Sequence, residues 1–291
     1  MPPERVIDFK ATMGSLLLVA LVSVLSALFG AVLSAADVRA LGFPFYSENS
    51  LESALANSLV FLGLVLLGTL FMLLIIRARR RPLLPVVMAV AVFLSFWGIL
   101  ELFIAYVLPV PDALMPVAEL LSLAVAAFTA ILIVKPVSIL LLDALLIVYG
   151  SMAGALFYSV LPPWSVASVA AVLAIYDLYS VFRGPLKRIL ESAVSEGSQP
   201  SVPNQLRGAV VYVGGLALGM GDVLIYSMLS PLYYLYPSPS IARWALGVMM
   251  LLVGFLCTLR MLRRRRFMPA LPLPVLMSIT VYFAYLVFVG G

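Results

Sequence analysis

Long apolar runs dominate the chain, and short polar segments separate them. Runs of about 17–25 apolar residues have the length needed to cross the hydrocarbon core of a bilayer. They predict nine transmembrane spans over residues 13–35, 53–76, 85–108, 115–134, 139–160, 163–182, 209–234, 240–259 and 269–289. Trp164 and Trp244 each open a span, as aromatic residues at membrane interfaces often do. The pattern predicts an all-α polytopic membrane protein.

Composition supports the same interpretation. Apolar residues make up 64% of the 291 residues and charged residues only 11%, which is more apolar surface than a soluble core absorbs. The first apolar run follows Lys10 and is long enough to span, so we expect no cleaved signal. The single cysteine, Cys257, rules out a disulfide framework within the chain. We expect a multi-pass protein of the cell membrane with the lipid bilayer as its surroundings.

Basic residues predict the orientation of the spans. With a cytoplasmic N-terminus, sixteen of the 18 Lys and Arg residues fall in cytoplasmic segments, and only Arg39 and Arg243 fall outside. Positive charge collects on the cytoplasmic side of membrane proteins. We therefore expect the N-terminus inside and the C-terminus outside. The net charge of +5 is then a topology signal and requires no nucleic-acid partner.

The longest predicted loop divides the chain into three parts. Residues 1–182 form a six-span part, residues 183–208 a cytoplasmic loop, and residues 209–291 a three-span part. The loop begins with Gly184-Pro185 and is rich in Ser, Gly and Pro, a composition typical of mobile polar segments. It lies between Asp177 and Asp222, where it could gate a site formed by them.

Asp177 and Asp222 lie within apolar spans, where a carboxylate costs a few kcal/mol and usually faces a water-filled cavity. Two such acids on successive spans suggest a shared proton and acid–base chemistry. The chain has no histidine, which removes His-based zinc sites and Ser–His or Cys–His dyads. Any hydrolysis must therefore depend on carboxylates, and we expect no cofactor.

Three other acids lie in or beside the spans. Glu101 and Glu119 sit toward the outer ends of theirs and can reach the interface, so we expect structural roles. Asp143 lies near the cytoplasmic end of the fifth span, where an interhelical hydrogen bond is its expected use.

The depth of Asp222 conflicts with a shared proton. Asp177 is about 8 Å from the end of its span, whereas Asp222 would be about 20 Å from the start of a helical seventh span. The segment Gly208–Gly215 also has a β-branched and aromatic centre between glycines, which is typical of a short strand. The helix would then start near Gly214, and the strand edge could pair with an extended substrate.

Glycines and prolines near the acids allow two interpretations each. Gly219 and Gly221 let a backbone or ligand approach closely, but they could equally serve helix packing. Pro269, Pro272 and Pro274 prevent a regular helix and leave free backbone groups, or they simply mark a helix start.

Three motifs in order resemble those of the presenilin and signal peptide peptidase family, whose members carry Tyr-Asp, Gly-x-Gly-Asp and Pro-Ala-Leu on the sixth, seventh and ninth of nine spans. Here they read Tyr176-Asp177, Gly219-Met220-Gly221-Asp222 and Pro269-Ala270-Leu271. The cytoplasmic N-terminus resembles the presenilin branch, and the compact chain looks like an archaeal homologue. The loop is short for the family, which puts autocleavage within it in doubt and allows a trimmed loop.

The resemblance implies an intramembrane aspartyl endopeptidase that cuts transmembrane segments of single-span proteins. Asp177 and Asp222 would be the catalytic pair, one activating water and the other donating a proton. Tyr176, Gly219, Met220 and Gly221 would shape the site together with Pro269, Ala270 and Leu271. The family uses no metal, and a homo-oligomer is possible.

Two other functions fit part of the pattern. A prepilin-type aspartyl peptidase also uses a Gly-x-Gly-Asp aspartate, although it explains neither nine spans nor Pro269-Ala270-Leu271. A proton-coupled transporter or channel also places carboxylates within the membrane. It predicts broken helices in related halves, and no internal repeat is evident in the sequence.

Overall fold

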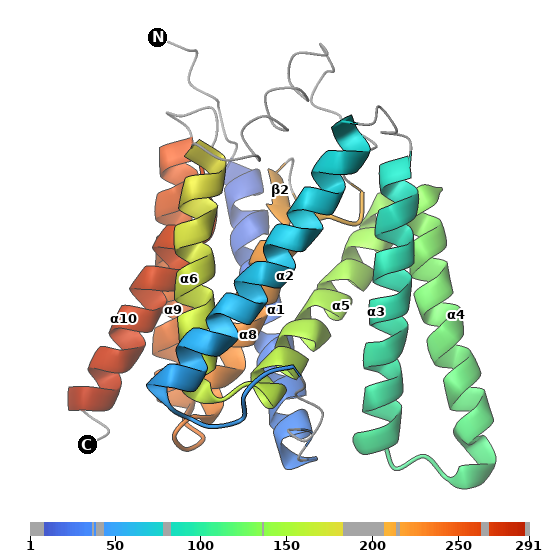
Figure 1. Cartoon of the computed structure of the whole chain (residues 1–291), viewed down its shortest axis with the longest axis horizontal. Helices are drawn as coiled ribbons and strands as arrows, with labels where there is room; N and C mark the ends of the chain where they lie inside the picture. Colours follow the sequence, from blue (N-terminus) through green and yellow to red (C-terminus); the bar gives the residue numbers. More distant parts are fainter. Residues whose placement is uncertain are drawn as a thin grey trace.

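The structure is a computed structural model that describes residues 9–36, 38, 44–77, 83–135, 137–182, 207–213, 216–262 and 268–288. Its N-terminal part contains six long helices (Figure 1). They are α1 (Phe9–Ala35), α2 (Leu51–Arg77), α3 (Leu84–Tyr106), α4 (Met115–Val134), α5 (Ile139–Val160) and α6 (Pro163–Phe182), with a short 3-10 turn η3 (Asp112–Leu114) before α4. The first six predicted spans are therefore confirmed as helices.

The C-terminal part begins with two strands and continues with three helices. The strands are β1 (Val210–Val213) and β2 (Leu216–Gly219), and the helices are α8 (Met220–Leu235), α9 (Ile241–Leu262) and α10 (Pro272–Phe288). Among the described residues, seven helices are long and apolar enough to cross a membrane, namely α1 to α6 and α9. Because α8 has 16 residues and α10 has 17, the count of nine spans and the orientation of the termini stay predictions.

The seventh predicted span is wrong as a single helix. Strands β1 and β2 pair antiparallel, with Val211 opposite Leu218 and Tyr212 opposite Ala217. The short strand predicted within residues 208–213 is confirmed, but α8 begins at Met220 and not near Gly214. Residues 216–219 are apolar and read equally well as membrane helix; their pairing with β1 satisfies the backbone groups that a helix would have satisfied.

The ninth span starts later than predicted. Residues 268–271 have no helical structure, and α10 begins at Pro272. A proline at the first helical position is favourable because its missing N–H would have had no partner within the helix. Irregular backbone is therefore confirmed for Pro269, Ala270 and Leu271, whereas Pro272 and Pro274 lie in the first turn of α10.

Helix α8 occupies the centre of the bundle. It packs against α1, α5, α6 and α9, whereas α3 and α4 form a pair at one side and α9 and α10 at the other (Figure 1). Two of its tyrosines, Tyr226 and Tyr233, are fully buried. A Cβ atom added to Gly154 of α5 would lie 2.2 Å from the Ser227 Cβ of α8, so this glycine permits the close approach of the two helices.

The predicted loop 183–208 falls almost wholly outside the described residues, which include only Arg207 and Gly208 of it. The proposed gating by this loop and its division of the chain stay predictions.

Candidate active site

Asp177 lies near the end of α6 and faces the irregular segment before α10. The backbone N–H of Leu271 donates a hydrogen bond to Asp177 Oδ2 at 3.2 Å, and the backbone of Ala270 bonds the same carboxyl group. These free amides exist because the chain at 268–271 is not helical. Two residues of the predicted Pro-Ala-Leu motif therefore contact the first aspartate directly.

Asp222 lies in the first turn of α8. Its Oδ2 accepts a hydrogen bond at 3.3 Å from the backbone N–H of Gly219, the residue that caps the helix. Acceptors at this position satisfy amides that lack a partner within the helix. The positive end of the helix dipole also favours a carboxylate there.

The structure brings the two aspartates together. Helices α6 and α8 pack against each other, and the carboxyl groups of Asp177 and Asp222 lie within electrostatic range of one another. The difference in depth expected from a helical seventh span does not occur, because the hairpin replaces the first part of that span. Two carboxyl groups that influence each other's ionisation in this way suit general acid–base chemistry.

Tyr226 is a site residue that the sequence reasoning missed. Its hydroxyl donates a hydrogen bond at 2.7 Å to the backbone carbonyl of Ala270, and it lies within electrostatic range of both aspartates. It follows Asp222 by four residues, so both side chains lie on one face of α8. The spacing could have pointed to Tyr226, because it places the tyrosine beside Asp222. A buried tyrosine hydroxyl usually has a hydrogen-bond partner.

The two glycines of the Gly-x-Gly-Asp motif have different surroundings. A Cβ atom added to Gly219 would lie 3.1 Å from Asp222 Oδ2, whereas one added to Gly221 would meet no atom within 4 Å. Between them, the Met220 amide donates to the Ala209 carbonyl at 2.8 Å and closes the hairpin. A side chain at Gly219 would therefore touch the Asp222 carboxylate, whereas the space beside Gly221 is open.

The remaining predicted residues are sequence neighbours of those described above. The hydroxyl of Tyr176, next to Asp177, is buried and has no hydrogen-bond partner within the part of the chain that the structure describes. Pro269 is buried, and so is the side chain of Leu271.

The acids expected to be structural lie away from the pair. Glu101 of α3 accepts hydrogen bonds from Trp97 at 2.9 Å and from Ser122 of α4, so it links two helices. Asp143 of α5 differs from the prediction of an interhelical bond: its Oδ1 accepts from the backbone N–H of Tyr212 in β1 at 3.2 Å. The reason is that the predicted seventh helix is a strand here, whose outer amides need acceptors.

One edge of β2 leads directly to Asp222. In an antiparallel pair, residues alternate between those that exchange hydrogen bonds and those whose backbone groups point outward. The Tyr212 amide points to Asp143, so Tyr212 and its opposite residue Ala217 form an outward-pointing pair. Gly219 is two residues further on and points the same way, with its amide on Asp222. The outer edge of β2 is therefore aligned with the second aspartate.

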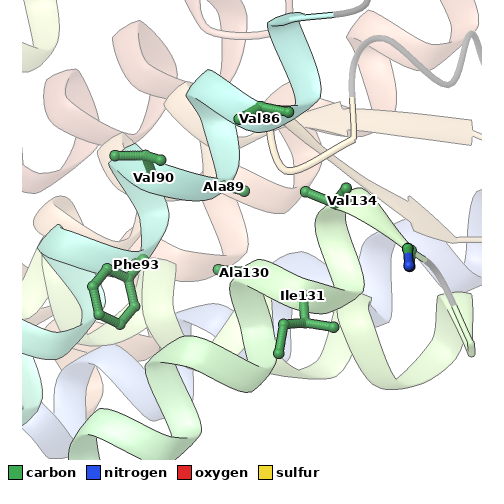
Figure 2. A pocket seen from close by; sticks show the side chains of 8 residues that line it. Val86, Ala89, Val90, Phe93, Ala130, Ile131 and Val134 are labelled. Atoms are coloured by element: carbon green, nitrogen blue, oxygen red, sulfur yellow. The ribbon is translucent and has the colours of Figure 1, made fainter.

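A separate apolar groove of about 430 Å³ lies between α3 and α4. Figure 2 shows Val90 and Phe93 of α3 facing Ala130 and Ile131 of α4, and Lys135 supplies the one charged side chain of the lining. The groove contains none of the site residues described above, so it has no part in the chemistry of the aspartates.

Comparison with known structures identifies a shared fold. Two crystal forms described as a presenilin family intramembrane aspartate protease match the chain. The C222 form has a TM-score of 0.63 and 19% identity, covering 94% of this chain and 97% of the other. The P2 form has a TM-score of 0.60 and 20% identity, covering 92% and 96%.

Curated relatives and a family model point the same way. Presenilin-B of Dictyostelium discoideum is 31% identical over 132 residues, 42% of this chain, and Presenilin-A of the same organism is 27% identical over 174 residues, 58% of this chain. The matched segments span only 26% and 27% of these relatives' own lengths. The family model described as Presenilin matches residues 16–200. With seven long apolar helices, the chain is a multi-pass integral membrane protein, and it belongs to the presenilin family.

Proposed function

We propose that the chain is an intramembrane aspartyl endopeptidase whose catalytic residues are Asp177 and Asp222. The observation that carries the proposal is that these two carboxyl groups interact electrostatically from the packed helices α6 and α8, inside a bundle of apolar helices. The family membership and the likeness to structures described as an intramembrane aspartate protease support it. A prepilin-type peptidase accounts for neither finding.

The chemistry requires two roles for the pair. One carboxylate takes a proton from a water molecule, which attacks the carbonyl carbon of the scissile peptide bond. The other carboxyl group donates its proton to the carbonyl oxygen, which gives a gem-diol. When the gem-diol collapses, the group that took the water proton passes it to the leaving amine, and the other group regains a proton from a gem-diol hydroxyl. Such steps need the proton to sit on either group in turn, which close, interacting carboxyl groups allow. No covalent acyl-enzyme forms.

The substrate we propose is a transmembrane segment of a single-span protein. A helix must unwind before its peptide bonds become accessible, and the unwound backbone then needs hydrogen-bond partners within the membrane. The outward-pointing amide and carbonyl of Ala217 on β2 would supply them by strand addition. The same edge carries Gly219, whose amide bonds Asp222, so an added strand would run past the catalytic pair.

The test is cleavage of a purified single-span substrate by the protein reconstituted in lipid vesicles. Asp177→Asn and Asp222→Asn keep the size of each side chain but cannot exchange the proton, and each should lower the rate at least about 100-fold, as expected for a lost general acid or base. A hydroxyethylene isostere of the scissile bond should inhibit the wild type.

Glu119→Gln provides the matched control, because Glu119 is an exposed acid of α4 outside the site, and its cleavage rate should equal that of the wild type. Full cleavage by either aspartate variant would contradict the proposal. Proton-coupled uptake into vesicles without proteolysis would favour the transporter instead.

A further inference from the structure

Asp143 is a buried acid that the proposed chemistry does not use. It lies in the second turn of α5 with only 5% of its surface exposed, and a carboxylate in such a position is costly unless it has a function. Its partner is the backbone N–H of Tyr212, at the centre of β1. The Tyr212 side chain also lies within electrostatic range of Asp143. Within the described ranges, this acid therefore bonds the hairpin and no other helix.

The bond occupies the outer edge of β1, whereas the central backbone groups of the outer edge of β2 have no hydrogen-bond partner among the described residues. Tyr212 uses the outer edge of β1, and the opposite residue, Ala217, directs its amide and carbonyl to the outer edge of β2. Ala217 is also exposed. A strand entering the site therefore has one edge to join, because Asp143 already holds the central amide of the other edge.

Beside the burial of Val211 and Leu218 in the apolar core, two points of attachment fix the backbone of the hairpin to the bundle. One point is covalent, where β2 continues directly into α8 at Met220. The other point is the hydrogen bond from Tyr212 to Asp143 on α5. Helices α5 and α8 approach closely at Gly154, so the two points cannot move far relative to each other. Without Asp143, the outer edge of β1 would lose its polar anchor, and only apolar packing and the covalent link to α8 would hold the hairpin.

We propose that Asp143 is a positioning residue that fixes the hairpin so that the edge of β2 stays aligned with Asp222, which sets the peptide bond that is cut. The inference rests on the proposed protease function. It predicts that losing the Asp143 acceptor changes where the substrate is cut and how well it binds, more than how fast a correctly bound substrate reacts. A residue that only stabilised the fold would not change the cleavage position.

The experiment compares variants at this one position in the vesicle assay. Asp143→Asn retains an oxygen acceptor for the Tyr212 amide. Asp143→Ser is too short to reach that amide, but its hydroxyl can bond the Ile139 carbonyl one turn earlier, as Ser23 bonds Val19 at 2.8 Å. Asp143→Leu removes the acceptor with an apolar side chain of similar size. Two different replacements keep the test decisive if one of them fails to fold.

Ser159→Ala is the matched control. Ser159 is a buried polar residue of the same helix, and among the residues that the structure describes its hydroxyl bonds the Ala155 carbonyl of α5 alone, at 2.9 Å. Its loss removes a polar group from α5 without touching the hairpin. Products are identified by mass, and KM and kcat are measured separately, with helical circular dichroism and thermal unfolding as checks on folding.

We expect Asp143→Asn and Ser159→Ala to give the single wild-type product with an unchanged KM. Asp143→Ser and Asp143→Leu should raise KM about tenfold, as the loss of a hydrogen bond to a charged group predicts, while kcat for the main product changes less. They should also yield new products cut two residues away, because strand pairing repeats every second residue.

An unchanged product pattern and KM in the folded Ser or Leu variant would overturn the inference. So would an Asn variant as defective as these two, because the acceptor would then not be what matters. Failure of the protease proposal gives a different result, namely no cleavage by the wild type or undiminished cleavage by Asp177→Asn.

Discussion

Asp222 is held by its own helix turn, whereas Asp177 is held by a segment 94 residues further along the chain. The amide of Gly219 reaches Asp222 as soon as the first turn of α8 forms. The amide of Leu271 reaches Asp177 only when the start of α10 docks against α6. The surroundings of one acid are therefore a local property of the sequence, and those of the other depend on tertiary packing.

Tyr226 connects the two arrangements. It lies one turn after Asp222 on α8, and its hydroxyl holds the Ala270 carbonyl, next to the amide that supports Asp177. The segment 268–271 is thus bound on both sides, by α6 through its amides and by α8 through a carbonyl. Loss of either contact should disturb Asp177 more than Asp222.

Removal of the Leu271 amide should have the largest effect. Leu271→Pro deletes the donor to Asp177 while keeping the carbonyl that starts α10. A hydrogen bond to a charged group contributes about 1.5–3 kcal/mol, so the cleavage rate should fall roughly 10- to 100-fold. Leu271→Met keeps the amide and should retain the wild-type rate. A folded Leu271→Pro protein with full activity would show that the distant support is not needed.

Removal of the Tyr226 hydroxyl should have an intermediate effect. Tyr226→Phe leaves the buried Ala270 carbonyl without its donor, which should lower the free energy of unfolding by about 1–3 kcal/mol and the cleavage rate about 5- to 10-fold. Thermal unfolding in detergent and the vesicle assay measure the two quantities.

Tyr233→Phe is the matched control for that variant. Tyr233 is equally buried on α8, about three turns after Asp222. Its hydroxyl donates to Ser278 Oγ of α10 at 2.7 Å. It should lose comparable stability but keep its cleavage rate. Equal losses of activity in both variants would reduce Tyr226 to a purely structural residue.

A methyl group added at Gly219, beside Asp222, should have the smallest effect. The Cβ of Gly219→Ala would lie 3.1 Å from Asp222 Oδ2, and both groups belong to one turn that can readjust. We expect a cost under about 1 kcal/mol and roughly a threefold loss of cleavage rate. Gly221→Ala, with no atom within 4 Å of its Cβ, should leave thermal unfolding unchanged. A loss at Gly219 greater than that of Leu271→Pro would reverse the comparison.

The same distinction explains what the sequence could predict. The two aspartates, the helices up to α6 and the strand at 208–213 follow from short patterns of apolar, acidic and glycine residues. The second strand, Leu216–Gly219, is apolar enough to pass for membrane helix, so the start of α8 at Met220 was missed. The predicted role of Asp143 was wrong for the same reason, since its partner belongs to the strand.

Contacts between distant segments could not be predicted in this way. The Tyr226 hydroxyl and the Ala270 carbonyl are 44 residues apart along the chain, and no periodicity relates them. Even at short range, burial was not foreseen: Arg243, predicted to lie on the non-cytoplasmic side, is buried and donates to the carbonyls of Tyr233 and Tyr234 at the end of α8. Such bonds depend on how helices are placed, which the apolar pattern of each span does not specify.

The shortness of α8 has a consequence for the access of water. At 1.5 Å per residue, its 16 residues measure about 24 Å, roughly 6 Å less than the hydrocarbon core of a typical bilayer. Because α1, α5, α6 and α9 surround α8, the hairpin and not lipid continues the chain beyond its first turn. Strand edges at membrane depth are tolerated only where they are buried in protein or line water, so the exposed edge of β2 at Ala217 should be the route by which water reaches the acid that consumes it.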